Sequence, residues 1–127
     1  MVTIVDDSFE LRYLISVLLE KSLGTPCLCI ASFKEAISQS NKVLESAVVI
    51  LDINLGPGQP DGVAVYEWLK GQGYRGKVFF LTGHAKGGQQ VRQAAKTGVS
   101  ILEKPMAPEE LIQLLAQAVG KVPVPFS

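Results

Sequence analysis

The fold class follows from residues 48–52, which read Val48-Val49-Ile50-Leu51-Asp52, four apolar residues that end directly in a carboxylate. A second apolar run, Val2-Thr3-Ile4-Val5, ends in Asp6 and Asp7. Runs of this kind are typical of parallel strands that helices cover on both faces. Because the carboxyl ends of parallel strands meet at one edge of a sheet, the three acids are expected to lie together there.

Short apolar runs alternate with amphipathic segments along the chain, which is the pattern of βα units. Strands are predicted at 2–5, 26–31, 47–51, 77–81 and 99–102. Between them, helices are predicted after the caps Ser8 and Asp61, from Ser32 to about Ser40, from near Gln89, and from Pro108 to Gly120. Right-handed crossovers then give an α/β fold of three layers, α/β/α, with a flavodoxin-like (βα)5 parallel sheet in the order 2-1-3-4-5.

Length and charge narrow the class of protein. The 127 residues provide for one domain, predicted over 1–121 with a C-terminal tail at 122–127. The formal net charge of zero does not favour direct binding to nucleic acid or to an anionic membrane. The acidic start does not resemble a secretory signal, and no apolar run approaches the roughly 20 residues that span a bilayer. A cytoplasmic location is therefore expected.

The acids at the predicted sheet edge point to a cation site. Two unit charges about 4 Å apart repel by roughly 4 kcal/mol at an effective dielectric of about 20, so a cation is needed to offset them. Oxygen ligands favour Mg²⁺, with Mn²⁺ as the alternative. Thr82 and Lys104 follow the fourth and fifth strands and reach the same edge. A metal, a hydroxyl and an ammonium around the carboxylate of Asp52 form a clamp for a phosphoryl group.

The chain resembles the receiver domain of two-component response regulators. The motifs that carry this resemblance are Val5-Asp6-Asp7, Leu51-Asp52-Ile53-Asn54-Leu55, Asp61-Gly62, Leu81-Thr82-Gly83 and Glu103-Lys104-Pro105. They occur in the family's order and span nearly the whole chain. The resemblance implies a phosphorelay function, in which Asp52 accepts a phosphoryl group from a histidine kinase or a phosphotransfer protein.

The resemblance also implies a role for each site residue. Asp7 would bind Mg²⁺ directly, Asp6 largely through water, and Asp52 and the backbone carbonyl of Asn54 would complete the protein ligands. Phosphoryl oxygens would be bound by Thr82, Lys104 and the backbone amides of Ile53 and Gly83. The bond from Lys104 to Pro105 would be cis, a form that is accessible mainly before proline.

Several residues depart from the family's pattern. Ile101 stands where most receivers carry the switch aromatic that works with the residue at Thr82, and Met106 replaces a frequent Phe. The loop from Asp52 to Asp61-Gly62 is about two residues longer than is usual in receivers, a difference that would reshape the rim where a kinase docks. Phe80-Leu81-Thr82-Gly83-His84 is similar to a stretch found in one group of stand-alone receivers. Asn54 and His84 are candidates for tuning hydrolysis of the phosphoryl group.

The leading hypothesis is therefore a phosphoacceptor rather than an enzyme, with only self-phosphorylation and dephosphorylation chemistry. Its state would be read by contact with an unknown downstream protein, and the chain would be a monomer or a homodimer. One alternative is a module of the same fold that signals without phosphate. A flavodoxin-like electron carrier or an aspartate-nucleophile phosphatase would require other patterns after the first strand, where Asp6 and Asp7 stand instead.

Overall fold

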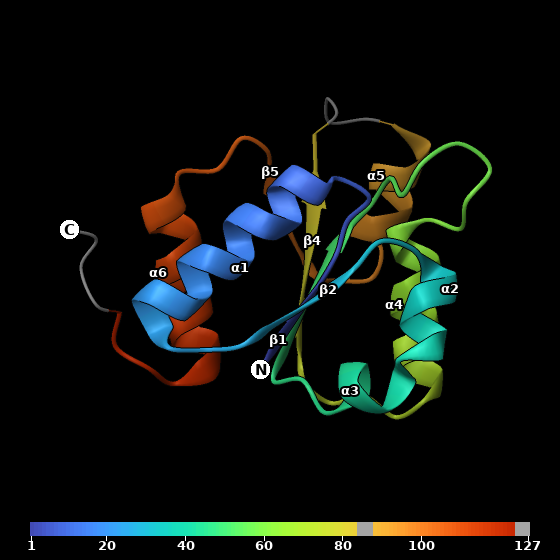
Figure 1. Ribbon diagram of the computed structural model, residues 1–127. Helices are drawn as coiled ribbons and strands as arrows, with labels where there is room; N and C mark the ends of the chain where they lie inside the picture. The colour runs from blue at the N-terminus through green and yellow to red at the C-terminus, as the bar shows by residue number, and fades with distance from the viewer. Residues whose placement is uncertain (84–87, 124–127) are drawn as a thin grey trace.

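A five-stranded parallel sheet forms the middle of three layers in the computed structural model, which describes residues 1–83 and 88–123 (Figure 1). The strand order is β2-β1-β3-β4-β5, which confirms the predicted order. The strands are β1 Val2–Val5, β2 Cys27–Ile30, β3 Val48–Asp52, β4 Lys77–Thr82 and β5 Ser100–Glu103. Every residue of β1 and β3 is buried, which explains why their sequences lack polar alternation.

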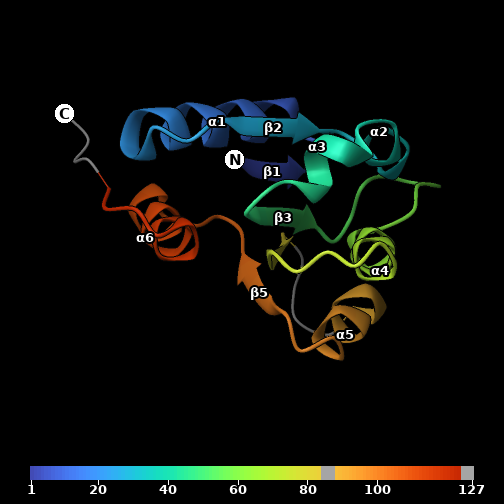
Figure 2. The same cartoon turned by 90° about the horizontal axis from the view of Figure 1, so that it is seen from below.

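Helices cover both faces of the sheet (Figure 2). One layer holds α1 Phe9–Leu23 and α6 Pro108–Val119, which pack with β1, β3 and β4 around Ile4, Leu19 and Leu115. The other layer holds α2 Phe33–Ser38, α3 Ser40–Leu44, α4 Gly62–Gly71 and α5 Gln89–Ala95. Its core includes Leu51, Leu69 and Phe80. Among the described residues, no helix is long and apolar enough to cross a membrane.

The residues at which the helices begin were predicted more accurately than the number of helices. The side chain of Ser8 accepts the backbone N–H of Leu11 at 3.3 Å and caps α1. The side chain of Asp61 accepts the backbone N–H of Ala64 at 3.0 Å and caps α4. The helix predicted from Ser32 to about Ser40 ends instead at Ser38, and α3 follows it after the single residue Gln39. Burial of Val43 on α3 against the core accounts for this extra helix.

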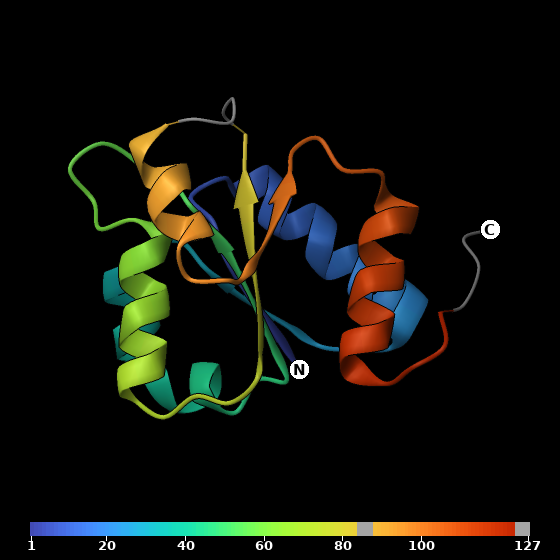
Figure 3. The same ribbon diagram turned by 180° about the vertical axis from the view of Figure 1, so that it is seen from behind.

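The register of the sheet brings the predicted site residues to one edge, toward which the arrowheads of β4 and β5 point in Figure 3. Asp52 is the last residue of β3 and pairs with Leu81 of β4. Thr82 is in turn the last residue of β4 and pairs with Glu103, the residue before Lys104. The ends of β3, β4 and β5 thus each deliver one predicted site residue to this edge, where Asp6 and Asp7 follow the end of β1.

Candidate functional site

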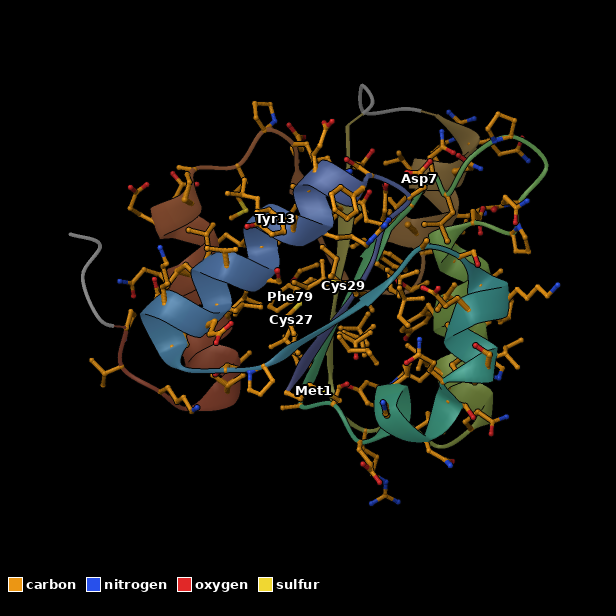
Figure 4. All side chains as sticks on the ribbon, in the orientation of Figure 1. Met1, Asp7, Tyr13, Cys27, Cys29 and Phe79 are labelled. Atoms are coloured by element: carbon orange, nitrogen blue, oxygen red, sulfur yellow. The ribbon has the colours of Figure 1, made fainter. Side chains whose placement is uncertain are left out.

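Three carboxylates meet where β1 and β3 end. An oxygen of Asp6, one of Asp7 and one of Asp52 all lie within 4.8 Å of one another. Asp6 is fully buried and Asp52 is 5% exposed, whereas Asp7 lies on the surface at the start of the segment that leads into α1 (Figure 4). The structure therefore brings together the three acids that the two apolar runs predict.

Lys104 lies between two of these acids. Its Nζ donates to Oδ2 of Asp6 at 2.9 Å and to Oδ2 of Asp52 at 3.2 Å. Burial alone lowers the pKa of Lys104, but the hydrogen bonds and charges of Asp6 and Asp52 outweigh it and raise the pKa above the ordinary value. The ammonium therefore stays charged and offsets part of the repulsion between the carboxylates.

The surroundings of Asp52 disfavour the ionised form of its carboxyl group. Burial, followed by the neighbouring charge of Asp6, raises the pKa of Asp52 to about 6, although Lys104 and the backbone N–H of Asn54 act in the opposite direction. The Asn54 N–H donates to Oδ1 of Asp52 at 3.3 Å. A bound cation would favour the ionised form of the Asp52 carboxylate.

The raised pKa predicts a dependence of stability on pH in the metal-free protein. The folded-state pKa of Asp52 is about 6 against an ordinary value of 3.8, so this group stabilises the fold at low pH and loses that contribution as pH rises through about 6. Asp52→Asn should therefore melt at a higher temperature than the parent at pH 8. The difference should shrink below pH 5, and a difference independent of pH would contradict the assigned cause.

A cavity of about 270 Å³ opens beside the acids. Its lining residues are Asp7, Asp52, Asn54, Gly56, Pro57, Gly83 and Lys104. The loop after β3 forms one wall and is anchored by the buried Leu55. Within it, Oδ1 of Asn54 accepts the N–H of Gly56 at 3.0 Å, and Gly56 has a φ of +111°, a conformation that side chains rarely adopt. The cavity therefore has an ordered rim next to Asp52.

Gly62 sets how closely α4 approaches the end of β3. A Cβ at this position would lie 2.4 Å from the backbone oxygen of Asp52 and 3.1 Å from Cα of Ile53. The Gly62 N–H donates to the carbonyl of Ile53 at 2.9 Å. The Asp61-Gly62 pair thus combines a helix cap with the close packing that fixes the backbone of Asp52.

The donor set fits Mg²⁺ or Mn²⁺. It consists of carboxylate oxygens at the mouth of a polar cavity, and hard divalent cations prefer such ligands while retaining several waters. Three carboxylates outweigh the single charge of Lys104, so the arrangement favours a cation. Asp6, Asp7 and Asp52 are the side chains that would hold it, and the carbonyl of Asn54 stays a predicted ligand.

The other predicted residues lie around this centre. Thr82 is 3% exposed at the end of β4, and the Lys104–Pro105 bond is cis. Ile101 is half-buried in β5, beside Phe80, and packs against the core under α4 and α5. His84 lies outside the described residues, as does the tail predicted at 122–127 from residue 124 onward.

Sequence reasoning missed Arg12, whose guanidinium donates to the backbone oxygen of Asp6 at 2.6 Å. The spacing places Arg12 on the same side of α1 as the cap Ser8, but its contact with Asp6 depends on the direction of α1 relative to β1. Sequence reasoning also missed an apolar groove of about 480 Å³ between α1 and the segment before α6. Met106 lines this groove, and Gly83 and Lys104 connect it to the cavity beside Asp52.

Comparison with known families gives a match over most of the chain. Residues 2–116 match the family model of the response regulator receiver domain. A search of curated proteins finds no match.

Solved structures agree with the family match. The receiver domain of NtrX from Brucella abortus superposes with a TM-score of 0.80 at 25% identity, covering 94% of this chain and 98% of that one. The beryllofluoride-activated NtrC4 receiver domain dimer gives a TM-score of 0.77 at 26% identity, covering 92% and 93% of the two chains. A longer NtrX chain, in complex with ADP, gives a TM-score of 0.76 at 25% identity; 94% of this chain is covered but only 26% of that one.

Proposed function

Because the chain belongs to the response regulator receiver family, we propose that Asp52 accepts a phosphoryl group from a histidine kinase or a phosphotransfer protein. The observation that carries this proposal is the meeting of Asp52 with Asp6, Asp7 and Lys104 at one edge of the sheet. In this proposal, residues 1–121 form the receiver domain and residues 122–127 a tail. The phosphoryl group is transferred in the cytoplasm.

The proposed chemistry is a single transfer to a carboxylate. An oxygen of ionised Asp52 attacks the phosphorus of a phosphohistidine, and an O–P bond forms while the P–N bond breaks. The departing imidazole nitrogen keeps the electron pair of the broken bond. Lys104, already 3.2 Å from Asp52, is placed to neutralise a phosphoryl oxygen after transfer. Thr82 contributes its hydroxyl from the end of β4.

Mg²⁺ would supply charge neutralisation for the phosphoryl oxygens when bound. The protein's own residues do the remaining work in the proposal. Asp6 and Asp7 hold the cation site, and the close packing of Gly62 keeps the end of β3 in place. The donor group, and later the water that hydrolyses the acyl phosphate, would reach Asp52 through the cavity of about 270 Å³ beside it.

Output is proposed to occur through contact with a downstream protein, with the chain acting as a monomer or a homodimer. Ile101 packs against the core beside Phe80 and carries no ring that can turn between solvent and interior. A change at Thr82 would therefore be transmitted by displacement of β5 and α5 rather than by rotation of an aromatic side chain. Asn54 and His84 stay candidates for setting the rate of dephosphorylation.

Incubation of the purified chain with acetyl phosphate tests the proposal, because acetyl phosphate needs no partner protein. We expect a mass gain of one phosphoryl group in the presence of Mg²⁺ and none with excess EDTA. Intact-mass spectrometry at successive times measures both uptake and later loss. Binding of Mg²⁺ without any uptake would contradict the proposal and support a module of this fold that signals without phosphate.

A further inference from the structure

Arg12 reaches from α1 to the backbone between two of the three site acids. We infer that Arg12 is a positioning residue that fixes the Asp6–Asp7 peptide for cation binding, and that Phe9 holds its guanidinium in place. The inference rests on the proposed function, because it concerns the same cation site. It adds a side chain that the five motifs of the family resemblance do not contain.

The contacts of Asp6 show how firmly this peptide is held. The N–H of Asp6 donates to the carbonyl of Ile30 at 3.0 Å, and its Oδ1 accepts the N–H of Ser8 at 2.8 Å. Its Oδ2 accepts from Lys104 at 2.9 Å, and its backbone oxygen accepts from Nη1 of Arg12 at 2.6 Å. Arg12 therefore makes the contact that fixes the plane of the peptide between Asp6 and Asp7.

The orientation of that peptide controls the exposed ligand. Rotation of the peptide plane after Asp6 changes the direction of the next Cα–Cβ bond, and therefore the position of the Asp7 carboxylate. Asp7 is on the surface, whereas Asp6 is held by its buried contacts. Loss of the Arg12 contact should thus displace Asp7 more than Asp6, and separate carboxylates that now lie within 4.8 Å.

Phe9 explains how a flexible side chain stays in this position. The guanidinium carbon of Arg12 lies 5.8 Å from the centroid of the Phe9 ring, within the range of a cation–π contact. The ring is 70% exposed, and it stacks on Tyr13 with 6.3 Å between the ring centroids. A large exposed aromatic at the first residue of α1 thus has a role, which is to restrict the guanidinium on its outer side.

Electrostatics and positioning predict opposite effects of losing this arginine. The positive charge of Arg12 repels a bound cation, so removal of the charge alone would strengthen Mg²⁺ binding. Removal of the hydrogen bond to Asp6 would weaken Mg²⁺ binding, because hydrogen bonds that orient the ligands of a metal typically carry about 10- to 100-fold in metal affinity. The sign of the change therefore separates a positioning role from a charge effect.

The test measures Mg²⁺ affinity of the full chain from the rise of its melting temperature with Mg²⁺ concentration. Arg12→Met keeps the aliphatic stem and should weaken Mg²⁺ binding at least about tenfold. Arg12→Lys, which keeps the charge and one possible donor, should fall between Arg12→Met and the parent. Phe9→Leu should weaken binding less than Arg12→Met. Arg75→Met is the matched control, because Arg75 is exposed between α4 and β4, at the opposite edge of the sheet.

The outcomes separate this inference from the proposed function. If the parent binds Mg²⁺ and takes up phosphoryl groups while Arg12→Met binds Mg²⁺ as tightly or more tightly, the inference is wrong and the proposed function stands. If the parent itself takes up no phosphoryl group, the proposed function fails. Should Arg12→Met not fold, unchanged Mg²⁺ affinity in both Arg12→Lys and Phe9→Leu would overturn the inference.

Discussion

Asp52→Asn is expected to reduce phosphoryl uptake from acetyl phosphate to below about 1% of the parent's rate, because an amide lacks the carboxylate nucleophile that forms the acyl phosphate. The substitution preserves the size of the side chain and its place at the end of β3. It also removes a charge that burial and Asp6 already disfavour, so the fold should be retained. Intact-mass spectrometry with Mg²⁺ and excess acetyl phosphate measures the loss.

Asp61→Asn is the matched control for this prediction. Asp61 is a nearby acid that caps α4 by accepting the N–H of Ala64 at 3.0 Å, and Asn caps helices about as well as Asp. This variant should take up the phosphoryl group at nearly the parent's rate. Uptake by Asp52→Asn equal to that of Asp61→Asn would show that Asp52 is not the acceptor.

Gly62→Ala should have the largest effect on stability. The added Cβ would lie 2.4 Å from the backbone oxygen of Asp52, and its three nearest atoms are all backbone atoms of Asp52 and Ile53, so no flexible side chain can move aside. Overpacking of this kind typically costs about 1–3 kcal/mol, and we expect a value near the upper end. Because relief of the clash must move the end of β3 or the start of α4, Mg²⁺ affinity should fall as well. Urea denaturation with and without Mg²⁺ measures both effects.

Gly71→Ala is the control within the same helix. A Cβ at Gly71 meets no atom within 4 Å, so the substitution adds no clash. Ala is favoured over Gly in helices by up to about 1 kcal/mol, so this variant should be as stable as the parent or slightly more stable. Equal stabilities of Gly62→Ala and Gly71→Ala would contradict the close packing of α4 on the Asp52 backbone.

The sheet and its acidic edge were predictable because both follow from local patterns. The apolar runs at 2–5 and 48–51 lie in central strands that are buried along their whole length, and such strands leave an unambiguous sequence signal. The caps Ser8 and Asp61 mark helix starts for a reason that is also local. Once the strand order was known, the carboxyl ends of β1 and β3 had to bring Asp6, Asp7 and Asp52 together.

Features that depend on packing were not predictable in the same way. Nothing in the residues around Gln39 distinguishes one helix from two, because burial of Val43 against the core decides it. Lys104 was expected to reach the phosphoryl site, but its ion pair with the buried Asp6 depends on the depth of that side chain below the surface. The contact of Arg12 with the Asp6 backbone likewise requires the direction of α1 relative to β1.

The position of Ile101 was recognised from the sequence, but the consequence of its packing was not. Sequence comparison with the family pattern identified Ile101 as an unusual residue at the switch position, and the structure places it beside Phe80 in the core under α4 and α5. A branched aliphatic side chain at that position has one dominant packing arrangement, since its χ1 is restricted. Under the proposed function, the phosphorylated state would therefore be transmitted by backbone displacement, which the sequence pattern does not encode.

Chemical trapping of the acyl phosphate identifies the residue that carries the phosphoryl group. The parent chain is treated with acetyl phosphate and Mg²⁺, and borohydride then reduces the acyl phosphate to an alcohol, which converts the modified aspartate to homoserine. Peptide mass spectrometry locates that residue. We expect homoserine at position 52 and at none of the other acids. Homoserine at position 6 or 7, or no reduced residue in a chain that has gained the phosphoryl mass, would contradict this expectation.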